Sequence, residues 1–209
     1  MANESATGTR QLEQFAKEER RRNSVRSLSA KEWLKNAREQ QAKHQVFSAY
    51  FSAYIALVCC ATQIMSDNGI KLQGDEDKWE GQSITKAFVD KRKEISAFLQ
   101  TDTGKKIKET IWQREIPEDS NATIMGAGND YQLSDATKTL GKYFKPGGPT
   151  NLNDAEMKLL CTQISLLFRK VRNRLFHGQK IYDERGDNGE FLEKLNPLLI
   201  EIVEILQRH

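Results

Sequence analysis

The sequence predicts an all-α fold, an up-and-down bundle of about four or five core helices, from two observations. Apolar residues recur at three- and four-residue steps through several long segments, which is the spacing of a helix with one buried face. No segment shows the strict alternation of apolar and polar residues that is typical of a half-buried strand. At 209 residues, the chain suits one substantial domain with extensions. We therefore expect a single helical domain over residues 29–209.

The N-terminal residues 1–28 differ in composition from the rest of the chain. They are small and polar, then charged in the stretch KEERRRNSVR, which predicts a flexible basic arm. Ser29 has the side chain of an N-cap, and Glu32 stands at the spacing of a capping box. We expect a helix to begin there and to continue through the next apolar stretch to about Met65.

Residues 46–65, VFSAYFSAYIALVCCATQIM, form the most apolar stretch of the chain. Their length matches the roughly 20 residues that a membrane-spanning helix needs. Polar residues interrupt them at Ser48, Ser52, Thr62 and Gln63. A helix that is apolar nearly all round is also typical of the centre of a helical bundle. We expect a buried core helix and no membrane segment.

Residues 66–153 are expected to form an irregular insertion in the domain. Gly69 and the acidic stretch QGDEDKWEGQ predict a break after the first core helix. Ser83 is expected to cap the next helix. The apolar face of that helix comprises Ile84, Phe88, Ile95, Phe98 and Leu99. A shorter helix is expected before Pro117 and another over residues 134–144, with loops elsewhere in this region.

The clearest amphipathic helix is expected over residues 155–177. Asn153 or Asp154 caps it, and Gly178 supplies the residue type that commonly ends a helix. Its apolar residues are Met157, Leu160, Cys161, Ile164, Leu167, Phe168, Val171 and Leu175.

A closing amphipathic helix is expected over residues 190–207. Its apolar residues are Phe191, Leu195, Leu198, Ile202, Val203 and Leu206. Pro197 either kinks this helix or occupies the first position of one capped by Asn196. We expect the two C-terminal helices and the apolar stretch 46–65 to make most of the core.

Composition excludes several kinds of function. The formal net charge of +3 and the isoelectric point of about 8.7 are mildly basic, which alone does not imply nucleic-acid binding. Cys59, Cys60 and Cys161 form neither a disulfide framework nor a zinc pattern. The three histidines are scattered, so we expect no metal and no cofactor. The polar N-terminal region has no recognisable signal peptide, which predicts a cytoplasmic protein.

Basic and polar side chains gather at the end of the helix over residues 155–177. Helical geometry puts Arg172 one step off the core face, so that its stem lies against the core and its head emerges. Asn173 and His177 are four residues apart, on one line that points away from the bundle. One interpretation is that Arg172, Arg174 and His177 only stabilise the helix C-terminus through its dipole.

The stretch VRNRLFHGQK around these residues resembles the signature of the HEPN superfamily, helical domains whose last long helix carries an R-N-x-x-x-H pattern. Here the pattern is Arg172, Asn173 and His177, followed by a small residue. The apolar stretch YFSAYIALVCCA resembles the first core helix of such domains more loosely, and the closing helix is also similar. The resemblance covers residues 155–207 specifically and 46–65 loosely, and it does not extend to 1–40 or 66–150.

The resemblance implies a metal-independent endoribonuclease of the toxin or phage-defence kind. His177 would take the proton from a ribose 2′-hydroxyl, which attacks the adjacent phosphate and leaves a 2′,3′-cyclic phosphate end. Arg172 would bind the phosphate with its planar fork of donors, and Asn173 would orient the imidazole or the phosphate. Arg174 and Lys180 would extend the positive cleft that RNA needs.

The resemblance also implies partners. A two-fold homodimer brings two such helix ends into one cleft and supplies it with two histidines and two arginines. An inhibitory or antitoxin partner would hold the activity in check. The alternative is a non-catalytic helical module that uses the same fold for dimerisation or for binding RNA or protein. The presence of Arg172, Asn173 and His177 together favours the enzyme.

Overall fold

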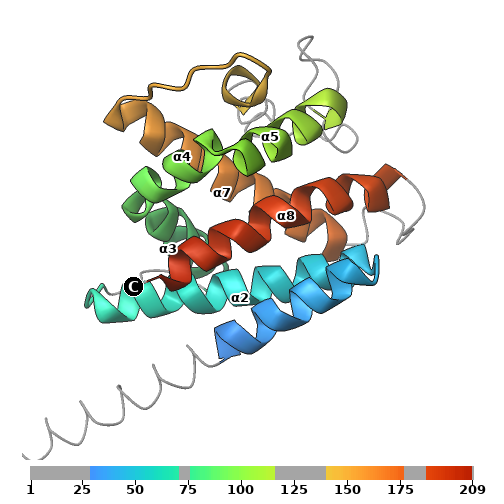
Figure 1. Ribbon diagram of the computed structural model, residues 1–209. Coiled ribbons are helices and arrows are strands. Elements are labelled where there is room, and N and C mark those ends of the chain that lie inside the picture. Colours follow the sequence, from blue (N-terminus) through green and yellow to red (C-terminus); the bar gives the residue numbers. More distant parts are fainter. Residues whose placement is uncertain (1–28, 71–75, 116–139, 177–186, 209) are drawn as a thin grey trace, which may run out of the picture.

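The computed structural model describes residues 29–70, 76–115, 140–176 and 187–208 (Figure 1). Over these residues every regular element is a helix, so the prediction of an all-α fold is confirmed. The helices are 29–42, α2 (Val46–Asp67), α3 (Glu76–Asp90), α4 (Arg92–Gln100), α5 (Asp102–Glu115), a short piece over 140–144, α7 (Asp154–Phe176) and α8 (Asp187–Gln207). The expected arm over residues 1–28 and the expected helix end at Gly178 lie outside the described residues.

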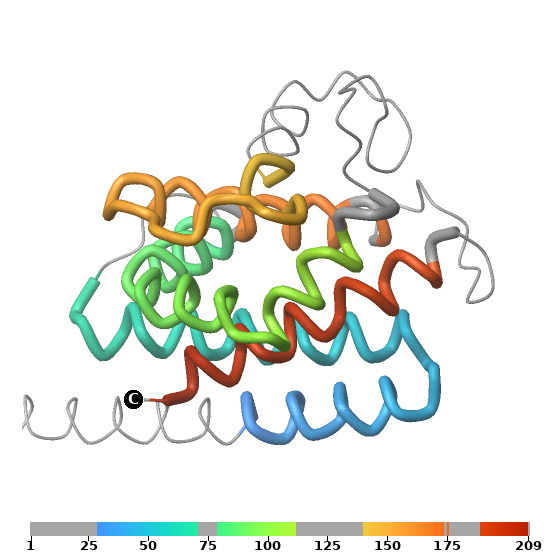
Figure 2. Tube along the Cα trace, turned by 45° about the horizontal axis from the view of Figure 1, so that its top comes forward, coloured from blue at the N-terminus to red at the C-terminus, as the bar shows by residue number. Residues whose placement is uncertain are grey.

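The expectation of one helix from residue 29 to residue 65 is wrong, because the chain reverses at His44. Helix 29–42 ends with a hydrogen bond of 2.9 Å from the amide of Gln45 to the carbonyl of Gln40. This bond is typical of a Schellman motif, whose preceding residue takes a left-handed backbone. His44 is that residue, with φ of 56°. Helix 29–42 and α2 therefore lie side by side as a hairpin (Figures 1 and 2).

Two serines that were expected at N-caps lie inside helices. Ser29 is itself helical, whereas an N-cap residue is not. Ser83 lies in the middle of α3, where its hydroxyl donates to the carbonyl oxygens of Trp79 at 2.8 Å and Glu80 at 3.0 Å. A serine hydroxyl bonds to the preceding turn of its own helix as well as to a helix start. For this reason Ser83 gave the wrong start for α3, which begins at Glu76.

α2 is a core helix, as expected, and it packs mainly on α8 and α3. Its largest buried side chains are those of Phe47, Tyr50, Leu57 and Met65. Of the helices that the structure describes, α2 alone has the length and composition of a membrane span, and 61% of that apolar window is buried inside the protein. The expected break after α2 is confirmed at Gly69, which has φ of 64°.

Over its described part, the region 66–153 is not the irregular insertion that the sequence suggested, since α3, α4, α5 and the short piece over 140–144 all contribute to the core. The single helix expected across Lys91 is two helices, α3 and α4. Buried side chains from this region join those of α2, α7 and α8 in one cluster; they are Ile84, Ala87, Phe88, Ile95, Leu99, Ile111, Leu140, Tyr143 and Phe144. Of the helix expected over 134–144, the structure describes residues 140–144, which are helical.

The helices pack mostly with partners that are distant in the sequence. In both views α8 crosses over α2, and these two helices form the most extensive contact of the fold (Figures 1 and 2). α3 packs on α2 and on α7, while α5 packs on α8 and α4. α3 thus lies between the first core helix and the helix that carries the predicted site.

α8 continues through Pro197, so the alternative in which this proline begins a helix is wrong. Proline has no amide hydrogen, which deprives the carbonyl of Glu193 of its helical donor. The side-chain amide of Gln41 donates to that carbonyl at a long 3.5 Å. The oxygen of the same side chain accepts a bond of 2.8 Å from the amide of Asn196, which also donates to the carbonyl of Val46 at 2.9 Å. The N-terminal hairpin thus bonds to α8 at its proline.

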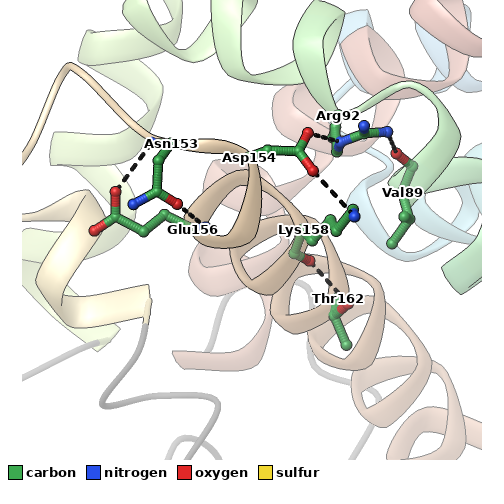
Figure 3. A network of polar contacts seen from close by, with 7 residues as sticks. All are labelled: Val89, Arg92, Asn153, Asp154, Glu156, Lys158 and Thr162. Carbon is green, nitrogen blue, oxygen red and sulfur yellow. Dashed lines mark hydrogen bonds and ion pairs between the residues drawn. The ribbon is translucent and has the colours of Figure 1, made fainter.

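The N-terminus of α7 is fixed by a capping box at Asn153 (Figure 3). The Oδ1 atom of Asn153 accepts a bond of 3.0 Å from the amide of Glu156, whose carboxylate accepts one of 3.1 Å from the amide of Asn153. Asp154, the other candidate cap, is ion-paired with Arg92 of α4 at 2.6 Å and with Lys158 at 3.0 Å. These two cations hold the pKa of Asp154 below its usual value.

Replacing Asn153 by alanine is expected to lower the free energy of unfolding by about 1 kcal/mol, because the first turn of α7 loses its cap. The variant Asn153→Ser keeps a capping oxygen and is expected to change this free energy by a few tenths of a kcal/mol. Urea denaturation followed by circular dichroism measures both. Equal losses in the two variants would contradict the capping role.

Candidate functional site

The C-terminal half of α7 is held against the core at Phe168. Its ring is fully buried and meets the ring of Phe88 of α3 edge to face, with the centroids 6.2 Å apart. The hydroxyl of Tyr50 of α2 donates to the carbonyl of Phe168 at 2.5 Å. Burial raises the pKa of Tyr50, so that its hydroxyl remains a donor. α7 is therefore fixed by two other helices just before the predicted site begins.

Polar contacts to Glu80 and Asn173 hold Arg172 at the boundary of α7 and α3. Its Nη2 atom lies 3.1 Å from Oε2 of Glu80 in α3, and its Nη1 atom donates to Oδ1 of Asn173 at 2.8 Å. The side chains of Arg172 and Glu80 are 23% and 19% exposed. Helical geometry alone predicted that the head of Arg172 emerges into solvent. In the structure it is largely covered, because the carboxylate of Glu80 in α3 attracts it. The structure thus brings together two of the predicted catalytic residues, Arg172 and Asn173.

Glu80 connects this pair to a third helix. Its Oε1 atom accepts a hydrogen bond of 2.6 Å from the hydroxyl of Tyr54 in α2. Burial, followed by the bond to Glu80, raises the pKa of Tyr54 well above its usual value, so the hydroxyl stays protonated and donates. The Tyr54 ring stacks on that of Tyr50, with the centroids 6.0 Å apart. A polar chain therefore runs from Tyr54 through Glu80 to Arg172 and Asn173.

Sequence reasoning did not single out Glu80 and Tyr54. Glu80 belongs to the acidic stretch that was interpreted as a break, and Tyr54 belongs to the apolar stretch that was interpreted only as core. Glu80 and Arg172 are 92 residues apart, so their contact leaves no local spacing pattern. Only the packing of α3 on α7 reveals it.

The other predicted site residues are described less fully or not at all. His177 and Lys180 lie outside the described residues. Arg174 is described only by its place in α7. Their roles remain the predictions that the sequence makes.

Two cysteines belong to the core. Cys60 and Cys161 are buried, and burial raises the pKa of each thiol to about 12. Such thiols stay protonated and unreactive at neutral pH. Over the described ranges, no three His, Cys, Asp or Glu side chains form a group that could hold a metal ion.

Comparisons of this chain with family models, with curated proteins and with solved structures found no match. The site itself is therefore the basis for a functional proposal. It contains an oriented arginine and an amide at the end of a long helix, with a tyrosine and a glutamate behind them.

Proposed function

We propose that this protein is a cytoplasmic, metal-independent endoribonuclease of the HEPN kind, with a role as a toxin or in phage defence. The observation that carries the proposal is the oriented guanidinium of Arg172, which contacts Asn173 and precedes His177 by five residues. The arrangement supplies a phosphate-binding cation and, in the sequence that follows, an imidazole. It uses no cofactor.

Arg172 suits the binding of a phosphate on which charge develops. A donor stabilises a transition state best when it is oriented before the reaction begins. Glu80 and Asn173 contact different nitrogen atoms of the guanidinium and so fix the plane of its fork. The carboxylate of Glu80 also offsets the cost of keeping an arginine partly buried while no RNA is bound.

His177 is the proposed general base. An imidazole with an ordinary pKa of about 6.5 can accept a proton near neutral pH. It would take the proton of a ribose 2′-hydroxyl, whose oxygen then attacks the neighbouring phosphorus. The bond to the 5′-oxygen breaks and this oxygen takes up a proton from the second histidine of the proposed dimer, which leaves a 2′,3′-cyclic phosphate and a 5′-hydroxyl. Arg174 and Lys180 would bind adjoining phosphates.

The second candidate is a non-catalytic helical module for dimerisation or for binding RNA or protein. The ion pair of Arg172 and Glu80 is also consistent with this candidate, because such a pair can join α7 to α3 without any role in catalysis. The two candidates differ in whether the protein cleaves RNA. An inhibitory partner that covers the end of α7 is part of the first proposal only.

The purified protein is expected to cleave total RNA in EDTA, since the proposed site has a base and a phosphate-binding cation but uses no metal. The products should carry 2′,3′-cyclic phosphates, which block end-labelling reactions that require a free 3′-hydroxyl. Gel electrophoresis before and after enzymatic opening of the cyclic phosphate tests both points. Activity that is lost in EDTA and restored by magnesium would rule out the mechanism.

A symmetric dimer is expected at micromolar concentration, because one imidazole per chain is too few for both acid and base roles. Light scattering measures the mass. Mixing the wild type with an excess of the inactive variant His177→Ala tests whether each chain contributes to the other's site: a mixed dimer holds one histidine, so cleavage should fall by more than dilution explains. Full activity in a monomeric wild-type protein would contradict the shared site.

A further inference from the structure

A second arginine of α7, Arg169, lies directly against α3 beside the proposed site. A Cβ atom built on Gly81 of α3 would lie no more than 2.6 Å from three atoms of its guanidinium, Cζ, Nη1 and Nη2. Atoms this close cannot coexist, so the guanidinium occupies the space that any side chain at position 81 would fill. Gly81 is therefore the residue that allows Arg169 to lie flat on α3.

Arg169 and Arg172 are neighbours on one face of α7, since they are three residues apart. Gly81, which Arg169 contacts, directly follows Glu80, which pairs with Arg172. Both arginines act on the hydroxyl of Tyr54, whose pKa each of them lowers in part. The two guanidinium groups thus converge on the same turn of α3.

The charges at this turn do not balance. Glu80 is the carboxylate partner of Arg172. Among the residues that the structure describes, Arg169 has no ion pair or hydrogen bond with a second carboxylate, although it is only partly exposed. Two like charges held together at low exposure are unfavourable unless an anion lies between or beside them. Among the residues that the structure describes here, two guanidinium groups therefore face one carboxylate, and an added anion would offset the excess positive charge.

We propose that Arg169 is a second phosphate-binding residue of this site. Its guanidinium lies in the space that Gly81 leaves open and binds the RNA backbone beside Arg172. This inference rests on the proposed function, because it takes the anion to be an RNA phosphate. A planar guanidinium matches the two non-bridging oxygens of a phosphodiester. Glu80 and Gly81 then have distinct roles: the first orients Arg172 and the second makes room for Arg169.

The test measures binding separately from cleavage. The probe is a fluorescent single-stranded RNA whose riboses are all 2′-O-methylated, so that no 2′-hydroxyl can attack. Anisotropy titrations over a range of salt concentrations compare the wild type with Arg169→Gln and with Gly81→Ala. The matched control is Lys145→Gln, which also removes one positive charge. Lys145 follows Lys142, which pairs with Glu156 in the first turn of α7. Arg169 lies about 22 Å from the start of α7, at about 1.5 Å per residue, so the control is far from the proposed site.

Arg169→Gln is expected to weaken binding of the probe roughly tenfold, which corresponds to the loss of one charge-assisted contact. The slope of log affinity against log salt should fall by about 0.7, the value for one phosphate on a single strand. On cleavable RNA the same variant should raise KM more than it lowers kcat. Lys145→Gln should change neither affinity nor slope by a comparable amount.

Gly81→Ala is the more specific test, because it leaves Arg169 in the chain and only displaces its guanidinium. Alanine is preferred to glycine within a helix, so the melting temperature should stay the same or rise. Binding of the probe should nevertheless weaken as it does for Arg169→Gln. Gly81→Ala and Arg169→Gln together should weaken it no further.

The outcomes separate this inference from the proposed function. If the wild type cleaves RNA but Arg169→Gln and Gly81→Ala bind the probe like Lys145→Gln, the inference is wrong and the ribonuclease stands. If the wild type binds the probe through Arg169 and cleaves nothing, the phosphate site is supported and the enzyme is refuted. If the wild type does not bind the probe, both are refuted.

Discussion

Replacing Arg172 by alanine is expected to reduce RNA cleavage by at least about 10²–10³-fold, the loss that follows removal of one oriented donor from a transition state. The reason is structural as well as chemical. Glu80 and Asn173 fix the guanidinium at 3.1 Å and 2.8 Å, so the substitution removes a donor that is already oriented. Initial rates on a defined RNA measure the effect.

The same substitution should also lower the free energy of unfolding, by about 1–2 kcal/mol. Glu80 is only 19% exposed and would keep its bond to Tyr54 but lose its cation. This modest loss leaves the protein folded at room temperature, so the loss of activity can be assigned to the site. Circular dichroism of the variant is the necessary control.

Arg172→Lys distinguishes a fork of donors from a simple positive charge. A lysine can form an ion pair with Glu80, which should recover most of the stability. It has a single nitrogen and cannot contact Glu80, Asn173 and a phosphate with a planar fork, so it should recover little activity. A lysine variant with near wild-type rates would show that charge alone is required.

His177→Ala is expected to abolish cleavage and to leave affinity for the 2′-O-methylated probe nearly unchanged, because the proposed base acts on the 2′-hydroxyl and not on the phosphate charge. Arg172→Ala should weaken both. Expression of the wild type without an inhibitor should also be more toxic than expression of His177→Ala. Equal toxicity and equal rates would favour the non-catalytic module.

The all-α class was predictable because it depends on periodicity, which is local. The apolar steps of α7 and α8 appear in the sequence as they do in the core, and Leu160, Ile164, Leu195 and Ile202 are all buried. Helix ends were less predictable. His44 takes a left-handed backbone without being a glycine, and nothing in its neighbourhood marks it as a turn. Its side chain contacts Glu193 of α8 at 3.0 Å, which is a tertiary contact.

The candidate site was predictable only where its residues are consecutive. Arg172 and Asn173 are adjacent in a recognisable pattern, and in the structure their side chains are in contact. Glu80, Tyr54 and Gly81 come from other helices and have no pattern of their own. Arg169 lay on the expected helix but was not singled out, because its meaning depends on the missing side chain at position 81. Contacts between helices, which one sequence does not encode as a spacing, supply this part of the site.

Replacing Phe168 by alanine is expected to have the largest effect on stability, a loss of about 3–5 kcal/mol. The ring is fully buried and packs edge to face on Phe88, so its removal leaves a cavity where α7 meets α3. The free energy of unfolding of a domain is only about 5–15 kcal/mol, and this loss is a large part of it. Urea denaturation of the variant measures it directly.

Phe168→Ala also tests how the site depends on the core. The residues immediately before Arg172 are positioned by Phe168, through its ring and through the bond of 2.5 Å from Tyr50 to its carbonyl. Phe168→Leu refills most of the cavity and should cost about 1 kcal/mol. Cleavage by the two variants should therefore fall in the order of their stabilities and recover at lower temperature, where more of the protein is folded. In Arg172→Ala, by contrast, the lost activity should not return on cooling, because there the fold is intact and the donor is absent. A Phe168→Ala protein that kept full stability would show that α7 is not anchored at this ring.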